Sequence, residues 1–95
     1  MARKSNKEMV MEPDELLDLV PDAVVDARGS ACPGPLLEAK KGVGTVGVGG
    51  VVEIRSSDPG SKGDIPIWAE QVGHEFLGAL KAEEGYDRIF VRRGK

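Results

Sequence analysis

The chain has 95 residues, with 13 basic and 16 acidic side chains, a net charge of −3 and 40% hydrophobic residues. This length allows one small domain with a single core. The negative charge argues against general binding to nucleic acid, and no apolar run is long enough to span a membrane. Because residues 1–11 also lack the apolar centre of a signal peptide, we expect a soluble, cytoplasmic protein with no membrane association.

Residues 1–22 are predicted to be an N-terminal tail that contains a short helix. The first eleven residues are polar and mixed, without a sustained period. From Pro13 onward, acidic residues precede apolar ones at helical spacing, and Pro21 closes the segment. We expect this helix to cap one edge of the core, and an arm that docks a partner is the alternative. The domain itself then spans residues 23–95.

A short strand at residues 23–26 leads to the only cysteine, Cys32, which directly precedes Pro33-Gly34-Pro35 and a helix expected from Leu36. Proline is favoured in the first turn of a helix, so Cys32 is predicted to be the N-cap. At that position the helix dipole and free backbone N–H groups favour the thiolate, which is the nucleophilic form. The alternative is a small, buried and inert cysteine.

The helix that follows Cys32 is predicted to end softly. Its apolar stripe is expected to comprise Leu36, Leu37, Ala39 and Val43. Two lysines, Lys40 and Lys41, lie elsewhere on its surface. Five glycines then fall within residues 42–50, and each interior glycine costs a helix about 1 kcal/mol relative to alanine. A phosphate-binding loop is excluded, because the Gly-Lys-Ser/Thr ending is absent and a strand follows.

The second half of the chain predicts a strand, a helix and a hairpin. The strand covers residues 51–55, and Asp58 lies in the turn after it. A capping box of Ser61 and Asp64 is expected to open the second helix, and Gly73 is expected to close it. The apolar face of this helix is predicted to comprise Ile65, Trp68, Ala69 and Val72. Residues 74–84 and 86–93 then read as two strands around Glu84-Gly85.

The order of these elements predicts an α/β (α+β) fold, a βαβαββ two-layer sandwich. We expect a four-stranded mixed sheet with both helices on one face. The helix that follows Cys32 then begins at one end of the sheet, where another protein can reach Cys32.

The cysteine count limits the chemistry of this chain. One cysteine excludes an intrachain disulfide, and there is no second thiol or histidine cluster to complete a metal site. We therefore expect no metal and no cofactor. Any redox chemistry at Cys32 must finish on a partner or a small thiol, which favours relay over self-contained disulfide exchange.

The chain also resembles the TusA/SirA-like sulfur carriers over about residues 23–93. Six segments carry the resemblance, in this order: Asp26-Ala27-Arg28-Gly29, Cys32-Pro33-Gly34-Pro35, Lys40-Lys41, Asp58-Pro59-Gly60-Ser61, Asp64-Ile65-Pro66-x-Trp68 and Gly73-His74-Glu75. The resemblance implies the same βαβαββ fold. It also implies that Cys32 accepts a sulfane sulfur as a persulfide from a donor protein, such as a cysteine desulfurase or a rhodanese-like protein, and relays it to an acceptor protein. The activity that the resemblance implies is that of a sulfurtransferase without turnover of a small-molecule substrate.

The resemblance assigns supporting roles to several charged residues. By position, Lys40 and Asp58 match charged residues around the thiol or at the donor interface, Lys41 lies beside Lys40, and Arg28 adds positive potential. Asp58 also has a structural reading as a turn residue. The resemblance leaves the pathway open among tRNA thiolation, molybdenum cofactor assembly, sulfur oxidation and selenium metabolism.

Three features depart from the family pattern: the long N-terminal tail, the glycine-rich stretch, and Gly34 at a position that is often acidic. They leave the thiol chemistry intact but put the identity of the partners in doubt. The rival hypothesis is a regulatory or protein-binding module in which Cys32 is a redox sensor. We expect a monomer in either case.

Overall fold

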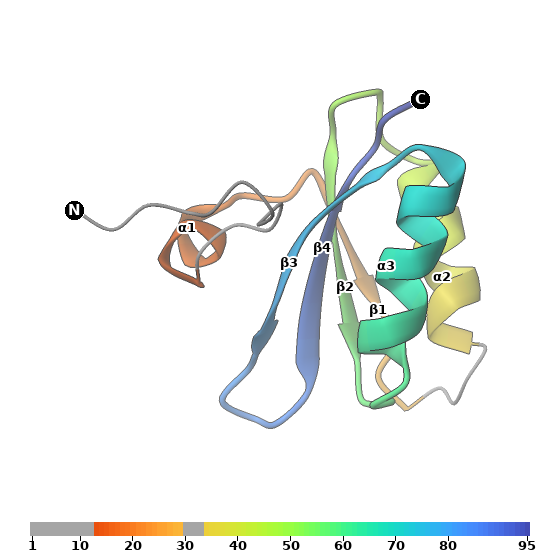
Figure 1. The fold of residues 1–95 in the computed structure, drawn as a ribbon. Helices are drawn as coiled ribbons and strands as arrows, with labels where there is room; N and C mark the ends of the chain where they lie inside the picture. The colour runs from red at the N-terminus through yellow and green to blue at the C-terminus, as the bar shows by residue number, and fades with distance from the viewer. Residues whose placement is uncertain (1–12, 30–33) are drawn as a thin grey trace.

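The structure is a computed structural model that describes residues 13–29 and 34–95 (Figure 1). Its elements are α1 (Pro13–Asp18), β1 (Ala23–Asp26), α2 (Gly34–Val43), β2 (Val51–Ser56), α3 (Ser61–Val72), β3 (Glu75–Lys81) and β4 (Asp87–Arg92). From β1 onward this is the predicted β-α-β-α-β-β order. The short N-terminal helix predicted after Pro13 is confirmed as α1.

The four strands form one mixed sheet in the order β1-β2-β4-β3. β1 and β2 are parallel, whereas β4 is antiparallel to both β2 and β3. The predicted hairpin is confirmed, with a turn over residues 82–86 between β3 and β4. β1 and β2 end at one edge of the sheet, where Ser56 lies opposite Asp87 and Asp87 lies opposite Lys81. We call this edge the carboxyl edge; it is at the bottom of Figure 1.

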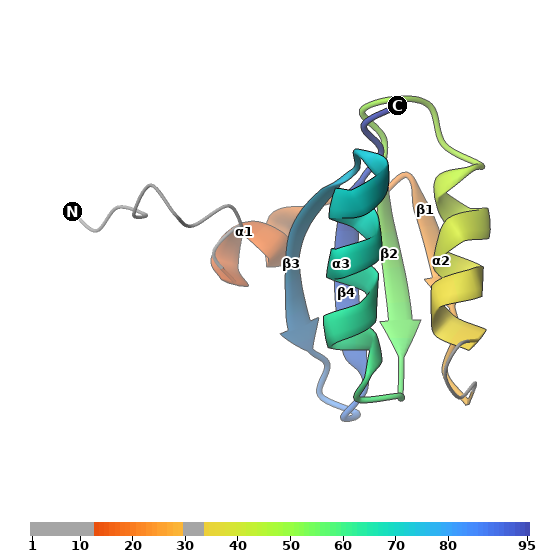
Figure 2. The same ribbon diagram turned by 45° about the vertical axis from the view of Figure 1, so that its right-hand side comes forward.

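α2 and α3 lie side by side on one face of the sheet, as predicted (Figure 2). The core between the two layers is formed by Ala39, Val43, Val46, Val52, Ile54, Ile65, Ala69, Ile89 and Val91. Trp68 packs against this core from α3, as predicted. Two members of the predicted apolar stripes are exposed instead, Leu37 at 50% and Val72 at 40%. The buried face of α2 is formed by Pro35, Ala39, Gly42 and Val43, and Leu37 lies outside it.

The opposite face of the sheet has a second, smaller core. α1 packs against β3 there, and Leu16 joins Val51, Leu77 and Phe90 in a buried cluster. Phe90 of β4 is fully buried beneath α1. The two-layer sandwich therefore carries a partial third layer, supplied by the segment that was expected to cap an edge.

The start of α3 differs from the sequence prediction. Its N-cap is Gly60, and no side chain caps the helix there, so the predicted capping box is wrong. Ser61 is instead the first helical residue, and its buried hydroxyl lies 2.8 Å from the hydroxyl of Ser56. At the other end, Gly73 is the predicted C-cap, with a left-handed φ of 92°.

The glycine-rich stretch is fastened at both ends. Inside α2, Gly42 is buried so close to Val25 that a Cβ atom would collide with the valine methyl group. Beyond the helix, the N–H of Gly49 donates to the carbonyl of Arg93 at 2.8 Å, and the N–H of Arg93 donates to the carbonyl of Gly50 at 2.8 Å. The Arg93 guanidinium also donates to the carbonyl of Val46 at 2.6 Å. The segment after α2, where composition predicts a weak helix end, is thus hydrogen-bonded to Arg93, which directly follows β4.

Candidate functional site

Cys32 and Pro33 lie outside the described residues, so the prediction that Cys32 is the N-cap of α2 stays a prediction. The described chain stops at Gly29 and resumes at Gly34, the first residue of α2 and two residues beyond Cys32. We call residues 30–33 the thiol segment. Pro35 is fully buried and fixes the first turn of α2 in the core. Since α2 follows β1, the thiol segment connects the carboxyl edge of the sheet to the N-terminus of a ten-residue helix.

Arg28, at the entrance to the thiol segment, is held by Asp26. Its Nε and Nη2 atoms donate to the two carboxylate oxygens of Asp26, both at 2.7 Å, and its backbone N–H donates at 3.2 Å. These hydrogen bonds lower the pKa of Asp26 to about 2 and raise the pKa of Arg28. The guanidinium also lies over the ring of Tyr86, 4.8 Å from its centroid. The positive potential expected of Arg28 is therefore largely balanced by its own partner.

Asp58 lies at the carboxyl edge, in the loop between β2 and α3. Its Oδ1 atom accepts a hydrogen bond from the N–H of Gly60 at 3.3 Å, which gives the residue the turn role considered above. Its Oδ2 atom is buried and has no hydrogen-bond partner among the described residues. A buried carboxylate oxygen without a donor is costly, so this atom is a site at which a donor from elsewhere would be stabilising.

Lys40 and Lys41 lie away from the helix start. Both are exposed in the later turns of α2, and Lys41 pairs with Glu38 at 3.6 Å. At 1.5 Å per residue, Lys40 is about 9 Å along the axis from Gly34. The structure therefore brings Arg28 and Asp58 to the carboxyl edge but places the two lysines on the flank of α2.

Sequence reasoning missed a charged cluster on the face of the sheet opposite α2 and α3. The carboxylate of Glu53 accepts hydrogen bonds from Arg55 at 2.8 Å and from Arg88 at 3.0 Å, and the Glu53 side chain is only 2% exposed. Burial alone would raise the pKa of Glu53, but the hydrogen bonds from Arg88 and Arg55 outweigh it and the pKa is lowered. The sequence signal for this cluster is the spacing of Glu53 and Arg55, because residues two apart on a strand point to the same face of the sheet.

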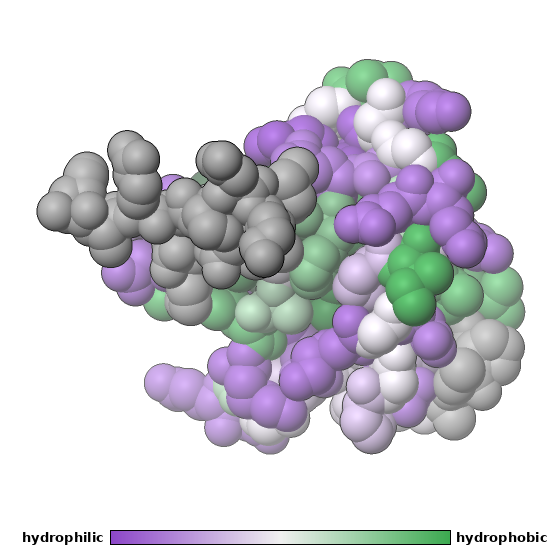
Figure 3. Space-filling model, in the orientation of Figure 1, coloured by the Kyte–Doolittle hydropathy of each residue, from purple (hydrophilic) through white to green (hydrophobic). Residues whose placement is uncertain are grey.

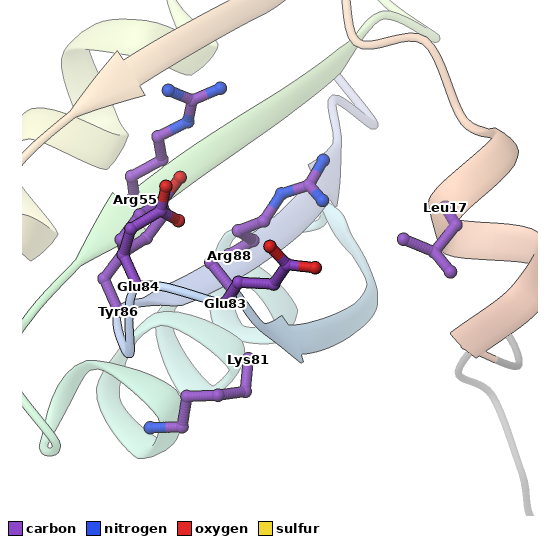
Figure 4. Close-up of a pocket in the computed structure, with 8 residues that line it drawn as sticks. Leu17, Arg55, Lys81, Glu83, Glu84, Tyr86 and Arg88 are labelled. Carbon is purple, nitrogen blue, oxygen red and sulfur yellow. The ribbon is translucent and has the colours of Figure 1, made fainter.

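A cavity of about 430 Å³ adjoins this cluster. Figure 4 shows Arg55 and Arg88 on the sheet, Glu83 and Glu84 on the hairpin, and Leu17 of α1 across the opening. The surface is indented between α1 and the hairpin in Figure 3. Cations and carboxylates line this cavity together, so it carries no strong charge of one sign.

The contacts of His74, the only histidine, indicate a structural role. Its Nδ1 atom accepts a hydrogen bond from the N–H of Gly94 at 3.0 Å, and its ring meets Trp68 edge-on at 5.4 Å. Burial, with the nearby charges of Arg93 and Lys95, lowers the pKa of His74. Across residues 13–29 and 34–95, no three His, Cys, Asp or Glu side chains are grouped so as to hold a metal ion.

None of the helices in the described part of the chain is long and apolar enough to span a bilayer.

Comparison with known proteins identifies the family. A family model described as sulfurtransferase TusA matches residues 23–93. The chain is 54% identical over 72 residues to a putative sulfur carrier protein of Archaeoglobus fulgidus, covering 76% of this chain and 97% of that protein. It is 40% identical over 78 residues to the sulfur carrier protein TusA of Pseudomonas entomophila, covering 82% and 96% of the two chains.

A solved structure shares the fold. The crystal structure of a SirA-like protein from Desulfitobacterium hafniense superposes with a TM-score of 0.67 at 28% identity, and the match covers 77% of this chain and 99% of that one. The resemblance inferred from the sequence motifs is thereby confirmed. The chain belongs to the TusA family of sulfur carriers.

Proposed function

We propose that this protein is a cytoplasmic sulfur carrier that accepts a sulfane sulfur on Cys32 as a persulfide and relays it to an acceptor protein. The observation that carries the proposal is that the only cysteine of a chain in this family stands two residues before a ten-residue helix. A helix of that length presents partial positive charge at its N-terminus, which favours both a thiolate and a persulfide anion.

The proposed transfer is a thiol exchange in each direction. The Cys32 thiolate attacks the outer sulfur of a persulfide on the donor, the donor's S–S bond breaks, and the donor cysteine leaves as a thiolate. An acceptor thiolate then attacks the outer sulfur on Cys32, which returns Cys32 to the thiolate. One S–S bond forms and one breaks at each step, so neither a metal, a cofactor nor an external oxidant is needed.

The other proposed site residues shape or surround this thiol. Pro33, Gly34 and Pro35 set the start of α2, and the buried Pro35 supports this role. At the carboxyl edge, the Oδ2 atom of Asp58 has no hydrogen-bond partner within residues 13–29 and 34–95. Lys40 and Lys41 are exposed on the flank of α2, where they suit contact with a partner protein rather than the thiol itself.

An apolar groove supports protein partners as donor and acceptor. It lies between the outer faces of α2 and α3, has a volume of about 210 Å³ and is lined by Leu36, Ile67 and Trp68 together with Asp64 and Gln71. Over these helices, Figure 3 shows hydrophobic residues bordered by hydrophilic ones. Ile67 is 58% exposed although it is a large apolar residue.

We propose that a monomer receives sulfur from a cysteine desulfurase or rhodanese-like donor and serves tRNA thiolation, molybdenum cofactor assembly or sulfur oxidation.

The test is direct transfer of sulfur, read by intact mass. The protein is incubated with a cysteine desulfurase and cysteine, or with a rhodanese and thiosulfate, beside Cys32→Ser. One extra sulfur that a reductant removes, present on the native protein and absent from Cys32→Ser, is the expected result. A native protein that takes no sulfur from either donor, but forms a reversible sulfenic acid with peroxide, would contradict the carrier function and favour the redox sensor.

A further inference from the structure

We propose that Asp26, Arg28 and Tyr86 form a clasp that fixes the chain where it enters the thiol segment, and that they act as positioning residues for sulfur transfer by Cys32. The inference rests on the proposed carrier function. It adds to that function three side chains that lie on the face of the sheet opposite α2 and α3, together with the hairpin between β3 and β4.

The first part of the clasp is a turn closed by Asp26, the last residue of β1. The carboxylate accepts the backbone N–H of Arg28 and both its Nε and Nη2 groups. Gly29 follows with a φ of +88°, a left-handed conformation that side chains disfavour. The direction of the chain is therefore set by residues 26–29, immediately before the thiol segment begins.

The second part is the ring of Tyr86, which comes from the turn of the hairpin. The guanidinium of Arg28 lies 4.8 Å from the ring centroid, and the guanidinium of Arg55 lies 6.0 Å from it. Arg55 is itself tied to the buried carboxylate of Glu53. A continuous set of contacts thus joins the buried carboxylate of Glu53 in the sheet to the entrance of the thiol segment.

The clasp contributes little to holding the fold together. The side chains of Arg28 and Asp26 are 42% and 52% exposed, and exposed ion pairs add little to stability because water and salt screen them. A bidentate pair stacked on a ring nevertheless fixes orientation well. Loss of the clasp should therefore disturb the geometry of the thiol segment more than it disturbs the fold.

The substitutions Arg28→Lys and Tyr86→Leu test the clasp. The first keeps the charge but loses the two-pronged pairing, and the second removes the ring. The rate of sulfur transfer to an acceptor should fall about two- to fivefold in each, the loss expected of an exposed cation–π contact. Alkylation of Cys32 measured against pH should show a higher thiol pKa, because the proposed stabilisation of the thiolate by the N-terminus of α2 depends on how residues 26–29 direct the chain toward that helix.

Two control variants distinguish loss of the clasp from a general effect of substituting a tyrosine or an exposed, paired arginine. Tyr86→Phe keeps the ring and should behave as the native protein. Arg92→Lys makes the Arg28→Lys change in a pair of similar exposure, since Arg92 donates to Glu75 at 3.2 Å and the two side chains are 42% and 48% exposed. Melting temperatures should stay close to the native value in all four.

The clasp is overturned if Tyr86→Leu and Arg28→Lys retain the native transfer rate and thiol pKa. It is also overturned if Tyr86→Phe or Arg92→Lys loses as much activity as its counterpart. If one clasp variant fails to fold, the other still decides the question. Should the native protein accept no sulfur at all, the carrier function fails, while the alkylation profiles still report on the clasp.

Discussion

The carboxylate of Glu53 lies in the sheet beneath solvent-facing arginines, and it remains ionised because Arg55 and Arg88 both donate to it. One buried carboxylate thus supports two cations, and Arg55 in turn reaches Tyr86. Replacement of Glu53 by a neutral residue leaves the two guanidinium groups without their shared carboxylate acceptor. At the scale of single residues, Glu53 is therefore the group on which the charged face depends.

We expect Glu53→Gln to lower the free energy of unfolding by about 1–3 kcal/mol at pH 7, as for loss of a buried charged acceptor. The pKa of Glu53 is lowered in the folded state. Its contribution is therefore present above the unfolded pKa of about 4.3 and is lost as the pH falls through the folded pKa. Urea unfolding from pH 7 to pH 2 should show a shallower acid loss in Glu53→Gln than in the native protein.

Glu75→Gln is the matched control, because Glu75 is an exposed glutamate paired with Arg92. It should change the free energy of unfolding by about 0.5 kcal/mol or less. A Glu53→Gln protein that unfolds at the same urea concentration as Glu75→Gln would refute the dependence on Glu53.

At the scale of the elements, α2 packs tightly against the sheet at a position where it carries a glycine. Gly42 sits against Val25 of β1 and Val52 of β2, with no room for a Cβ atom. Composition alone suggested that this glycine weakens the helix. The packing instead indicates that it sets the distance between α2 and the strand that leads into the thiol segment.

We expect Gly42→Ala to destabilise the protein by about 1–3 kcal/mol, because overpacking against Val25 outweighs the gain of about 1 kcal/mol in helix propensity. Gly63→Ala in α3 is the control, since a Cβ there meets nothing within 4 Å. It should be stabilising by up to about 1 kcal/mol. Chemical denaturation of both variants measures the difference, and equal effects would contradict the close-packing account.

The order and type of the elements could be predicted from the sequence because each has a local signal. A run of β-branched and aromatic residues marks β4, and Gly73 marks the end of α3. Contacts between distant segments have no such signal. The partnership of Glu53 with Arg88, 35 residues away, and the burial of Phe90 under α1 depend on register and on which face a remote helix covers. For the site, the family motif identified Cys32, but nothing local connected Arg28 to Tyr86.

For the molecule as a whole, α1 turns a sandwich with one open face into a partly covered one. Leu16 is 1% exposed in the cluster with Leu77 and Phe90, whereas its neighbour Leu17 is 62% exposed. The departure from the family pattern at the N-terminus thus includes a structural element.

We expect Leu16→Ala to lower the free energy of unfolding by about 2–5 kcal/mol, the range for a buried leucine. Leu17→Ala removes the same atoms from an exposed position and should cost about 0.5 kcal/mol or less. Thermal and urea unfolding compare the two. Similar midpoints would show that α1 does not contribute to the core.

The only tryptophan and the only tyrosine of the chain report on different regions. Trp68 packs on the core of α2 and α3 beside His74, while Tyr86 lies between Arg28 and Arg55 at the carboxyl edge. The protein thus carries two intrinsic chromophores, one in the helical layer and one beside Arg28 at the carboxyl edge. Coincident unfolding curves from the two would indicate a single cooperative unit, and an earlier tyrosine signal would reveal local opening at the functional end.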